Sequence, residues 1–193
     1  KQVMGLLMLA AAAYFIGVGV SGMLVTPPEP PSRSYLWIVA GVIMVAAAWL
    51  IIRTFQISKK GSNRLVFGGV GMALLAAAVL GGMMLTQKGP INWVYYTPER
   101  FAQSKDDGNV VVMEFTAEWC LNCKALEQSV LATDTVVKLF KESGVVPMKV
   151  DLTGNNDAGN DMLAEVGGLR IPLLVVFRAD GEIAWEGDFY TVE

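Results

Sequence analysis

Two cysteines three residues apart are the side chains of this sequence best suited to do chemistry. Cys120 and Cys123 are the only cysteines of the 193-residue chain, and they lie in the segment VVVMEFTAEWCLNCKAL at residues 110–126. Such a pair can bind a metal ion, form a structural disulfide or exchange with other disulfides. Structural zinc sites favour four cysteine or histidine ligands, and the chain has no histidine, so we expect no metal. Two cysteines also cannot form the dense disulfide framework of a small secreted domain.

The C-x-x-C spacing suits thiol-disulfide exchange. This chemistry needs one thiolate that attacks a disulfide and a second thiol that resolves the mixed disulfide. The pair follows a strongly β-forming run and is predicted to open a helix. There the unpaired amides and the positive end of the helix dipole stabilise a thiolate. We therefore expect Cys120 to be the nucleophile and Cys123 the resolving thiol.

The elements that must position this pair are predicted in the second half of the chain. Thr97 as N-cap and Pro98 at the first helical position indicate a short helix. Further strands are predicted at residues 110–115, 145–152, 173–178 and 183–186, and further helices at 120–131, 135–142 and 158–166. Strands that alternate with helices favour a mixed sheet covered on both faces. The expected fold class is therefore α/β.

Residues 1–88 are predicted to form a membrane region. Apolar residues make up 53% of the chain and the mean hydropathy is +0.46, and a run of about 20 apolar residues spans the hydrocarbon layer as a helix. Transmembrane helices are predicted at about residues 3–25, 35–52 and 65–85. A cleaved signal peptide is the alternative for the first span, although it lacks a cleavage site. Buried soluble helices are the alternative for all three, although no charged face interrupts them.

The charges of the chain predict its orientation and exclude one class of partner. The loop between the second and third spans holds Arg53, Lys59, Lys60 and Arg64 and no acid, so the positive-inside rule makes it cytoplasmic. The residues after 85 are then expected on the periplasmic side of a bacterial inner membrane, with membrane lipid as a partner. The net charge of −3 provides no basic field for nucleic acid.

Residues 89–96 are predicted to be an interfacial linker that leads into a soluble domain at residues 97–193. Trp93, Tyr95 and Tyr96 suit the headgroup layer, and the alternative is that they pack on the soluble domain. The chain begins at Lys1 without a methionine and ends at GDFYTVE, where a helix is expected to begin. We therefore expect a fragment of a longer membrane protein, with the soluble domain truncated at its C-terminus.

The segment VVVMEFTAEWCLNCK resembles the active-site segment of the thioredoxin superfamily. The strand, the WCxxCK motif and a later Ile-Pro before a strand occur in the order that this fold requires, over about residues 92–193. Three membrane spans before such a domain are similar, more specifically, to the C-terminal part of thiol:disulfide interchange proteins of the DsbD and ScsB type. The resemblance implies a thioredoxin-like fold, a redox-active Cys120–Cys123 disulfide and no cofactor or metal.

The resemblance also implies three further site residues. Trp119 matches the aromatic residue before the cysteine pair. Glu114 matches the buried acid that accepts a proton from the resolving cysteine. Pro172, preceded by Ile171, matches the cis-proline that faces the disulfide. The plainer alternatives are a packing role for the tryptophan, a solvent-facing side chain for the glutamate and an ordinary trans peptide bond before the proline.

Four other residues near the pair are not expected to carry the chemistry. Glu118 is expected to be a solvated loop acid with a slight influence on the reduction potential. Lys124 is expected to be an exposed cation of the first helical turn, outside the site. Leu121 and Asn122 stand where thioredoxin itself has Gly-Pro, and these positions influence the potential. The resemblance therefore does not transfer a value for it.

The resemblance implies a protein-disulfide reductase that passes electrons from an upstream membrane electron-transfer domain to extracytoplasmic disulfide-containing proteins. Residues 1–90 contain no cysteine, so the membrane cysteine pair of such a relay is expected upstream of this chain. One alternative is a self-standing membrane-anchored thioredoxin for cytochrome c biogenesis or thiol repair. Others are a binding module with a structural disulfide and a metal-handling protein, although the methionines lie mostly in the apolar spans.

Overall fold

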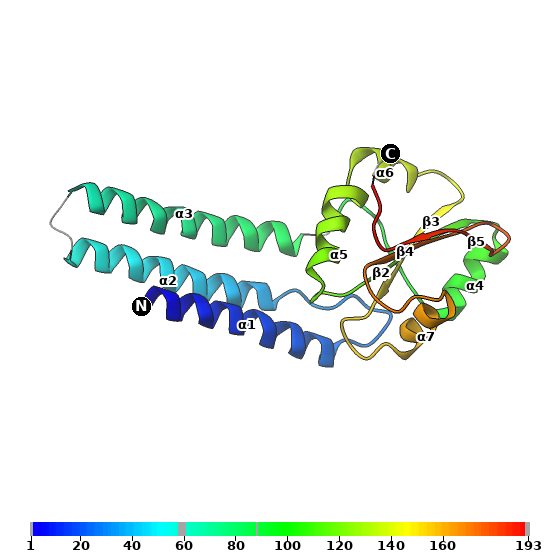
Figure 1. The fold of residues 1–193 in the computed structure, drawn as a ribbon, viewed down its shortest axis with the longest axis horizontal. Coiled ribbons are helices and arrows are strands. Elements are labelled where there is room, and N and C mark those ends of the chain that lie inside the picture. The colour runs from blue at the N-terminus through cyan, green and yellow to red at the C-terminus, as the bar shows by residue number, and fades with distance from the viewer. Residues whose placement is uncertain (1, 58–60, 88, 192–193) are drawn as a thin grey trace. The chain divides into compact units, whose positions relative to one another are not determined.

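The computed structural model describes residues 2–57, 61–87 and 89–191 (Figure 1). Its contacts divide the chain into two compact units. One comprises residues 1–21 and 32–88, and the other comprises residues 22–31 and 89–193. Lys59 and Lys60 of the predicted basic loop lie outside the described residues.

The first unit contains three long apolar helices. These are α1 (Gln2–Leu24), α2 (Tyr35–Ile57) and α3 (Gly61–Thr86), and each is long and apolar enough to cross a membrane. Small residues let α2 and α3 pack closely, since a Cβ atom at Gly71 would collide with the side chain of Ile51. The helix α2 continues five residues past the predicted end at 52. In this last part the Arg53 guanidinium lies over the Trp49 ring, and the Thr54 hydroxyl donates to the Leu50 carbonyl.

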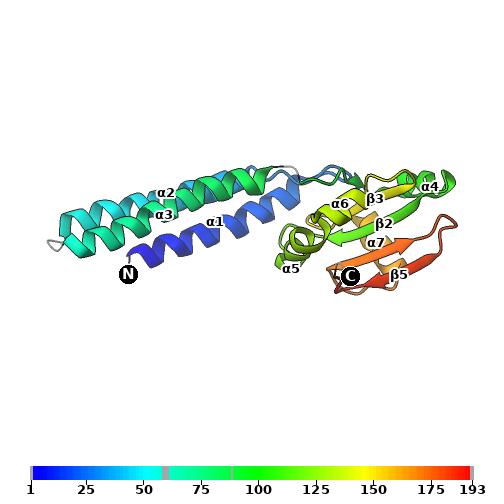
Figure 2. The same ribbon diagram turned by 90° about the horizontal axis from the view of Figure 1, so that it is seen from above.

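The second unit contains a five-stranded sheet with the strand order β1-β3-β2-β4-β5. Figure 2 labels three of these strands, β2, β3 and β5. The strands are β1 (Val94–Tyr95), β2 (Val110–Thr116), β3 (Val145–Asp151), β4 (Leu173–Phe177) and β5 (Ile183–Gly187). Both β1 and β2 run parallel to β3, whereas β4 is antiparallel to β2 and β5 is antiparallel to β4. This is the mixed sheet that the strand and helix pattern predicts.

Helices cover both faces of the sheet. They are α4 (Pro98–Asp106), α5 (Leu121–Leu126), the π-helical turn η1 (Glu127–Leu131), α6 (Asp134–Leu139) and α7 (Asp157–Glu165). Side chains of α4 and α7 pack on one face together with alternate residues of β2 (Val111, Met113 and Phe115). Side chains of α5, η1 and α6 pack on the other face. Because side chains of a strand alternate between faces, Glu114 lies on the face that α5 and η1 cover.

The aromatic residues before the domain pack on it rather than extending the linker. Val94 and Tyr95 pair with Met148 and Lys149 of β3, and Tyr96 is buried in the core. The Trp93 ring lies edge-on against the ring of Phe140, with the ring centroids 5.8 Å apart. The structure thus corresponds to the second of the two alternatives for these aromatics. A two-residue strand is too short to be visible in a sequence pattern, and only pairing with β3 creates it.

The predicted helix at residues 120–131 is divided. After α5 the chain widens into η1, where the amide of Ala132 donates to the carbonyl of Glu127, five residues earlier, at 2.8 Å. Such widened turns are often found at functional sites. Here the turn begins at Glu127, whose carboxylate forms an ion pair with Lys149 of β3.

Truncation of Phe177, a residue of the core, is expected to cause a large loss of stability. Its ring is 4% exposed and lies edge-on against Phe101, at 4.9 Å between centroids. Phe177→Ala is expected to lower the free energy of unfolding by about 3–5 kcal/mol, because it leaves a cavity between β4 and α4. Limited proteolysis of the chain in detergent across a urea series measures this loss. Ile183→Ala, at a half-exposed position of β5, serves as the control and should change stability little.

Candidate active site

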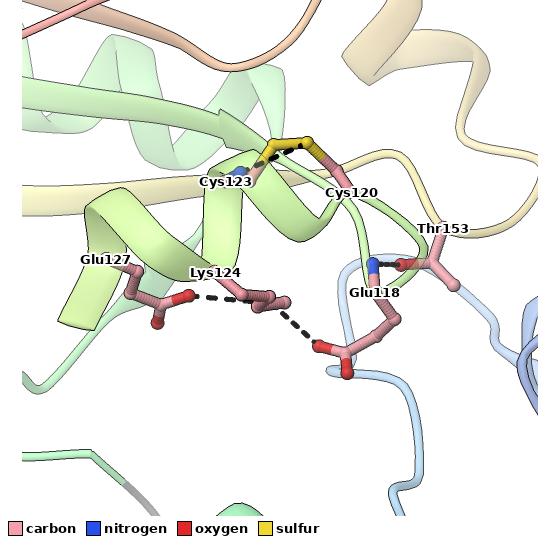
Figure 3. The surroundings of a disulfide bond; sticks show 6 residues. All are labelled: Glu118, Cys120, Cys123, Lys124, Glu127 and Thr153. Atoms are coloured by element: carbon pink, nitrogen blue, oxygen red, sulfur yellow. Dashed lines mark hydrogen bonds and ion pairs between the residues drawn. A yellow bond between two sulfur atoms is a disulfide. The ribbon is translucent and has the colours of Figure 1, made fainter. Parts of the chain in front are cut away.

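The cysteine pair sits at the start of α5 and is a disulfide, with the two Cα atoms 5.3 Å apart (Figure 3). Cys120 is the N-cap of α5, and its sulfur accepts a hydrogen bond from the amide of Cys123 at 3.2 Å. Cys120 is 8% exposed, whereas Cys123 is fully buried. Cys120 is therefore the less buried residue of the pair. The roles of Cys120 as nucleophile and Cys123 as resolving thiol stay predictions.

Glu114 lies fully buried in the central strand, on the face that carries α5. Its carboxylate lies 3.3 Å from the ammonium of Lys149. Among the residues that the structure describes, neither of its oxygens accepts a hydrogen bond. Burial raises the pKa of Glu114 to about 7, and the opposing charge of Lys149 limits the rise. A carboxyl group with this pKa can accept a proton near neutral pH and release it again.

Lys149 is a site residue that the sequence patterns did not single out. It pairs in register with Glu114 across β2 and β3, and it is 4% exposed. Its ammonium forms ion pairs with both Glu114 and Glu127 and lies 4.3 Å from the ring centroid of Trp93. The available signal was a lysine within the run VVPMKV, whose other residues are apolar. A buried lysine is rare unless it is paired.

Glu118 and Lys124 differ from expectation. Glu118 is 7% exposed, so it is not a solvated loop acid, and its amide donates to the Thr153 hydroxyl at 2.8 Å. Lys124 is not a free surface cation, because its ammonium lies 2.9 Å from Glu118 and 3.4 Å from Glu127. The reason is tertiary. The loop after β2 folds against the turn after β3, and no pattern within the loop itself encodes that contact.

The loop before β4 completes the surroundings of the disulfide. The Ile171–Pro172 peptide bond is cis, as predicted, and Ile171 packs against a cluster formed by Ala117 and the two cysteines. Trp119 is 51% exposed, so it is not packed in the core, and its role in recognition stays a prediction. The structure thus brings Ile171 of the proline loop against the two cysteines, whereas the carboxylate of Glu114 contacts Lys149.

The arrangement can perform dithiol exchange without a bound group. It offers one cysteine that is 8% exposed, a second that is fully buried, and a buried carboxyl group on the face of the sheet that α5 covers. Within residues 2–57, 61–87 and 89–191, no cluster of three or more histidine, cysteine, aspartate or glutamate side chains could hold a metal ion.

Comparison with known proteins places this domain among thioredoxin-like sequences. Residues 92–179 match the family model described as thioredoxin-like. The chain is 25% identical over 203 residues to the thiol:disulfide interchange protein DsbD of Vibrio cholerae, covering 94% of this chain and 30% of that protein. It is 24% identical to DsbD of Pseudomonas fluorescens, covering 94% and 33%. The oxidised C-terminal domain of Neisseria meningitidis DsbD is 24% identical, with a TM-score of 0.41, and covers 50% of this chain and 86% of that structure.

The chain spans about a third of the length of these two curated relatives. The match reaches beyond the soluble domain, since it covers 94% of this chain in both cases and so includes residues of the three apolar helices. Residues 92–179 are thus a thioredoxin-like domain, preceded by three long apolar helices, in a chain that is similar to thiol:disulfide interchange proteins of the DsbD type.

Proposed function

We propose that the chain is a thiol-disulfide oxidoreductase that reduces protein disulfides through Cys120 and Cys123. The observation that carries the proposal is the asymmetry of the pair. Cys120 is 8% exposed at the N-cap of α5, whereas Cys123 is fully buried. A purely structural disulfide has no need for this arrangement, and a disulfide that turns over requires it.

The reaction begins from the reduced pair. The Cys120 thiolate attacks one sulfur of a partner disulfide, so that a bond forms between the two proteins and the second partner sulfur leaves as a thiolate. The Cys123 thiolate then attacks the Cys120 sulfur and releases the first partner sulfur. The partner disulfide has gained two electrons and becomes two thiols after protonation. The chain has lost two electrons and ends as the Cys120–Cys123 disulfide of this structure.

Glu114 accepts the proton that the Cys123 thiol must lose. The Cys123 thiol must lose its proton before it can attack, and it is buried away from bulk solvent. The pKa of Glu114, raised to about 7 by burial, lets this carboxylate take the proton near neutral pH. Lys149 favours the ionised form of Glu114 across their 3.3 Å ion pair, which keeps the base available for the next cycle.

The similarity to DsbD supports a proposal for the source and the destination of the electrons. We propose that the three apolar helices anchor the domain on the periplasmic side of a bacterial inner membrane. An upstream membrane electron-transfer domain would reduce the pair again, and extracytoplasmic proteins would receive the electrons. The similarity along the apolar helices as well as the soluble domain supports this assignment over a self-standing anchored thioredoxin for cytochrome c biogenesis or thiol repair.

Insulin reduction tests the activity. The purified chain in detergent, supplied with dithiothreitol, is expected to accelerate insulin precipitation well above dithiothreitol alone, because the domain offers an accessible nucleophile. Cys120→Ser is expected to return the rate to that of dithiothreitol. Ser129→Ala, on the exposed side of η1, is the matched control and should keep full activity. A wild-type chain without activity would instead favour a binding module with a structural disulfide.

The reduction potential tests the direction. A domain that passes electrons onward is expected to have a potential closer to the value of about −270 mV of thioredoxin than to the value of about −120 mV of the strong oxidant DsbA. Equilibration of the chain with glutathione buffers, followed by thiol alkylation and mass measurement, gives this potential. A value near that of the oxidant would reverse the proposed direction of electron flow.

A further inference from the structure

Residues 22–31, the end of α1 and the connection to α2, belong to the same compact unit as the thioredoxin-like domain. We call them the proline segment, because they include Pro27, Pro28, Pro30 and Pro31. By its place in the chain this segment joins two predicted membrane spans. Its place in the fold gives it contacts with the soluble domain.

Two glycines let the backbones of the proline segment and the domain approach each other closely. A Cβ atom at Gly154, in the turn after β3, would collide with the carbonyl oxygen of Gly22. A Cβ atom at Gly22 would lie 2.7 Å from the carbonyl oxygen of Thr153, which is closer than Cβ atoms approach other atoms. Close approach of two backbones is one of the uses of glycine. A side chain at either position would therefore displace the segment.

The proline segment also fills a recess of the domain. Pro28 and Pro31 line the same cavity as Tyr95, Tyr96 and Asn156. The space left between them is about 10 Å³, which is about the room that one water molecule needs. Aromatic residues commonly line the grooves that bind proline-rich chains. The recess thus has both the shape and the kind of side chain that suit this occupant.

The proline segment is stiff by its own structure. Proline fixes the backbone φ angle, and the amide of Glu29 donates to the carbonyl of Thr26 at 3.1 Å, which closes a turn. The hydroxyl of Ser21 donates to the carbonyl of Ser32 at 3.0 Å and ties the two ends together. A segment that is already ordered loses little conformational entropy on binding. A small contact area is therefore sufficient for docking.

We propose that the proline segment is an internal ligand of the thioredoxin-like domain, and that the recess beside Tyr95 and Tyr96 is its binding site. Because the segment continues into α1 and α2, docking attaches the domain to the apolar helices a second time, in addition to the connection after α3. The inference does not depend on the proposed exchange, since the segment provides no group to the redox pair.

Distances between two spin labels test the docking in the full chain in detergent. Cys120→Ser and Cys123→Ser remove the native cysteines, so that labels attach only to introduced ones. Thr26→Cys and Gln103→Cys place labels at exposed positions of the proline segment and α4, and pulsed electron resonance should give one narrow distance distribution. A second pair, Gln103→Cys and Glu186→Cys, lies within the domain and reports whether the domain stays folded.

Gly154→Ala is expected to release the proline segment. The backbone of Gly154 lies outside the left-handed region, so alanine adds the collision with Gly22 without backbone strain. A flexible chain of ten residues has a root-mean-square end-to-end distance of roughly 17 Å, so the distribution from Thr26 to Gln103 should at least about double in width. Asn155→Ala, at the exposed neighbouring position, is the matched control and should leave the distribution narrow.

Replacement of all four prolines by serine tests the docking from the other side. This change lies outside the sheet and its helices, so it should broaden the same distribution while the pair within the domain stays narrow. If Gly154→Ala also broadens the pair within the domain, the serine variant decides. The inference is overturned if the unaltered segment gives a distribution as broad as the serine variant. A narrow distribution in Gly154→Ala with an intact domain would overturn it as well.

Insulin reduction by the chain with its native cysteines judges the proposed function separately. Activity without docking would remove the internal ligand and leave the exchange standing. Docking without activity would leave the ligand standing and remove the exchange.

Discussion

Cys123→Ala is expected to accumulate covalent complexes between this chain and its natural partners. Cys120 can still attack a partner disulfide, but no second sulfur remains to release the partner, so the mixed disulfide persists. Cys123 is fully buried, and alanine fills part of the same space without a polar group. The altered domain should therefore fold. We expect turnover of insulin to fall by at least about a thousandfold, since each chain is blocked after one attack.

Non-reducing electrophoresis of cells that express this variant, followed by mass spectrometry of the shifted bands, measures the trapping. The bands should disappear on reduction and should be absent when Cys120→Ser is added to the same chain. Partners that carry structural disulfides and reside outside the cytoplasm are the expected class. Bands that persist in the double variant would show that the complexes do not depend on the nucleophile, and they would argue against the mechanism.

Glu114→Gln is expected to slow the resolving step rather than the first attack. Glutamine keeps the shape of the side chain but cannot accept the proton of Cys123. Loss of a general base costs about a hundredfold or more. Rapid-mixing measurements on a small aromatic disulfide should show mixed disulfide that forms at the normal rate and decays slowly. The decay should also lose its dependence on a group with a pKa of about 7. Unaltered decay would show that another group accepts the proton.

The same residue makes the stability of the oxidised domain depend on pH. The folded pKa of Glu114, about 7, lies above its ordinary value of 4.5. The folded state therefore binds more protons than the unfolded state between these values, and the free energy of unfolding falls as pH rises through this range. The loss is up to about 3 kcal/mol by pH 8. Glu114→Gln should remove most of it, whereas Glu165→Gln, on the exposed side of α7, should keep it. Proteolysis in urea at pH 5 and pH 8 provides the comparison.

The sequence was most informative where structure is local. The apolar runs place α1, α2 and α3, because a spanning helix needs little beyond its own length and hydropathy. The β-forming run and Thr97 place β2 and α4 in the same way. The short strand β1 and the widened turn η1 were not predictable, because pairing with β3 creates the first and contacts of Glu127 across the fold accompany the second.

The same distinction between local structure and tertiary contacts applies to the candidate site. The spacing of Cys120 and Cys123 at a strand-to-helix junction was sufficient to predict a redox pair, since the geometry of one helical turn fixes their relation. The burial of both residues is a result of folding. The environment of Lys124 was not predictable, because a first-turn lysine is usually solvated. It becomes part of the site only when Glu118 folds inward and η1 brings Glu127 near.

By itself the sequence determined the chemistry available to this protein, which is two thiols three residues apart, a nearby acid and three apolar helices before them. Only the tertiary structure decided which charges act on that chemistry. Lys149 meets Glu114 because β3 lies beside β2 in register, and Lys124 meets Glu118 because the loop after β2 packs on the turn after β3. The physical reason is that helices and redox motifs arise from neighbours in the chain, whereas the electrostatic environment of a thiol arises from residues brought together by folding.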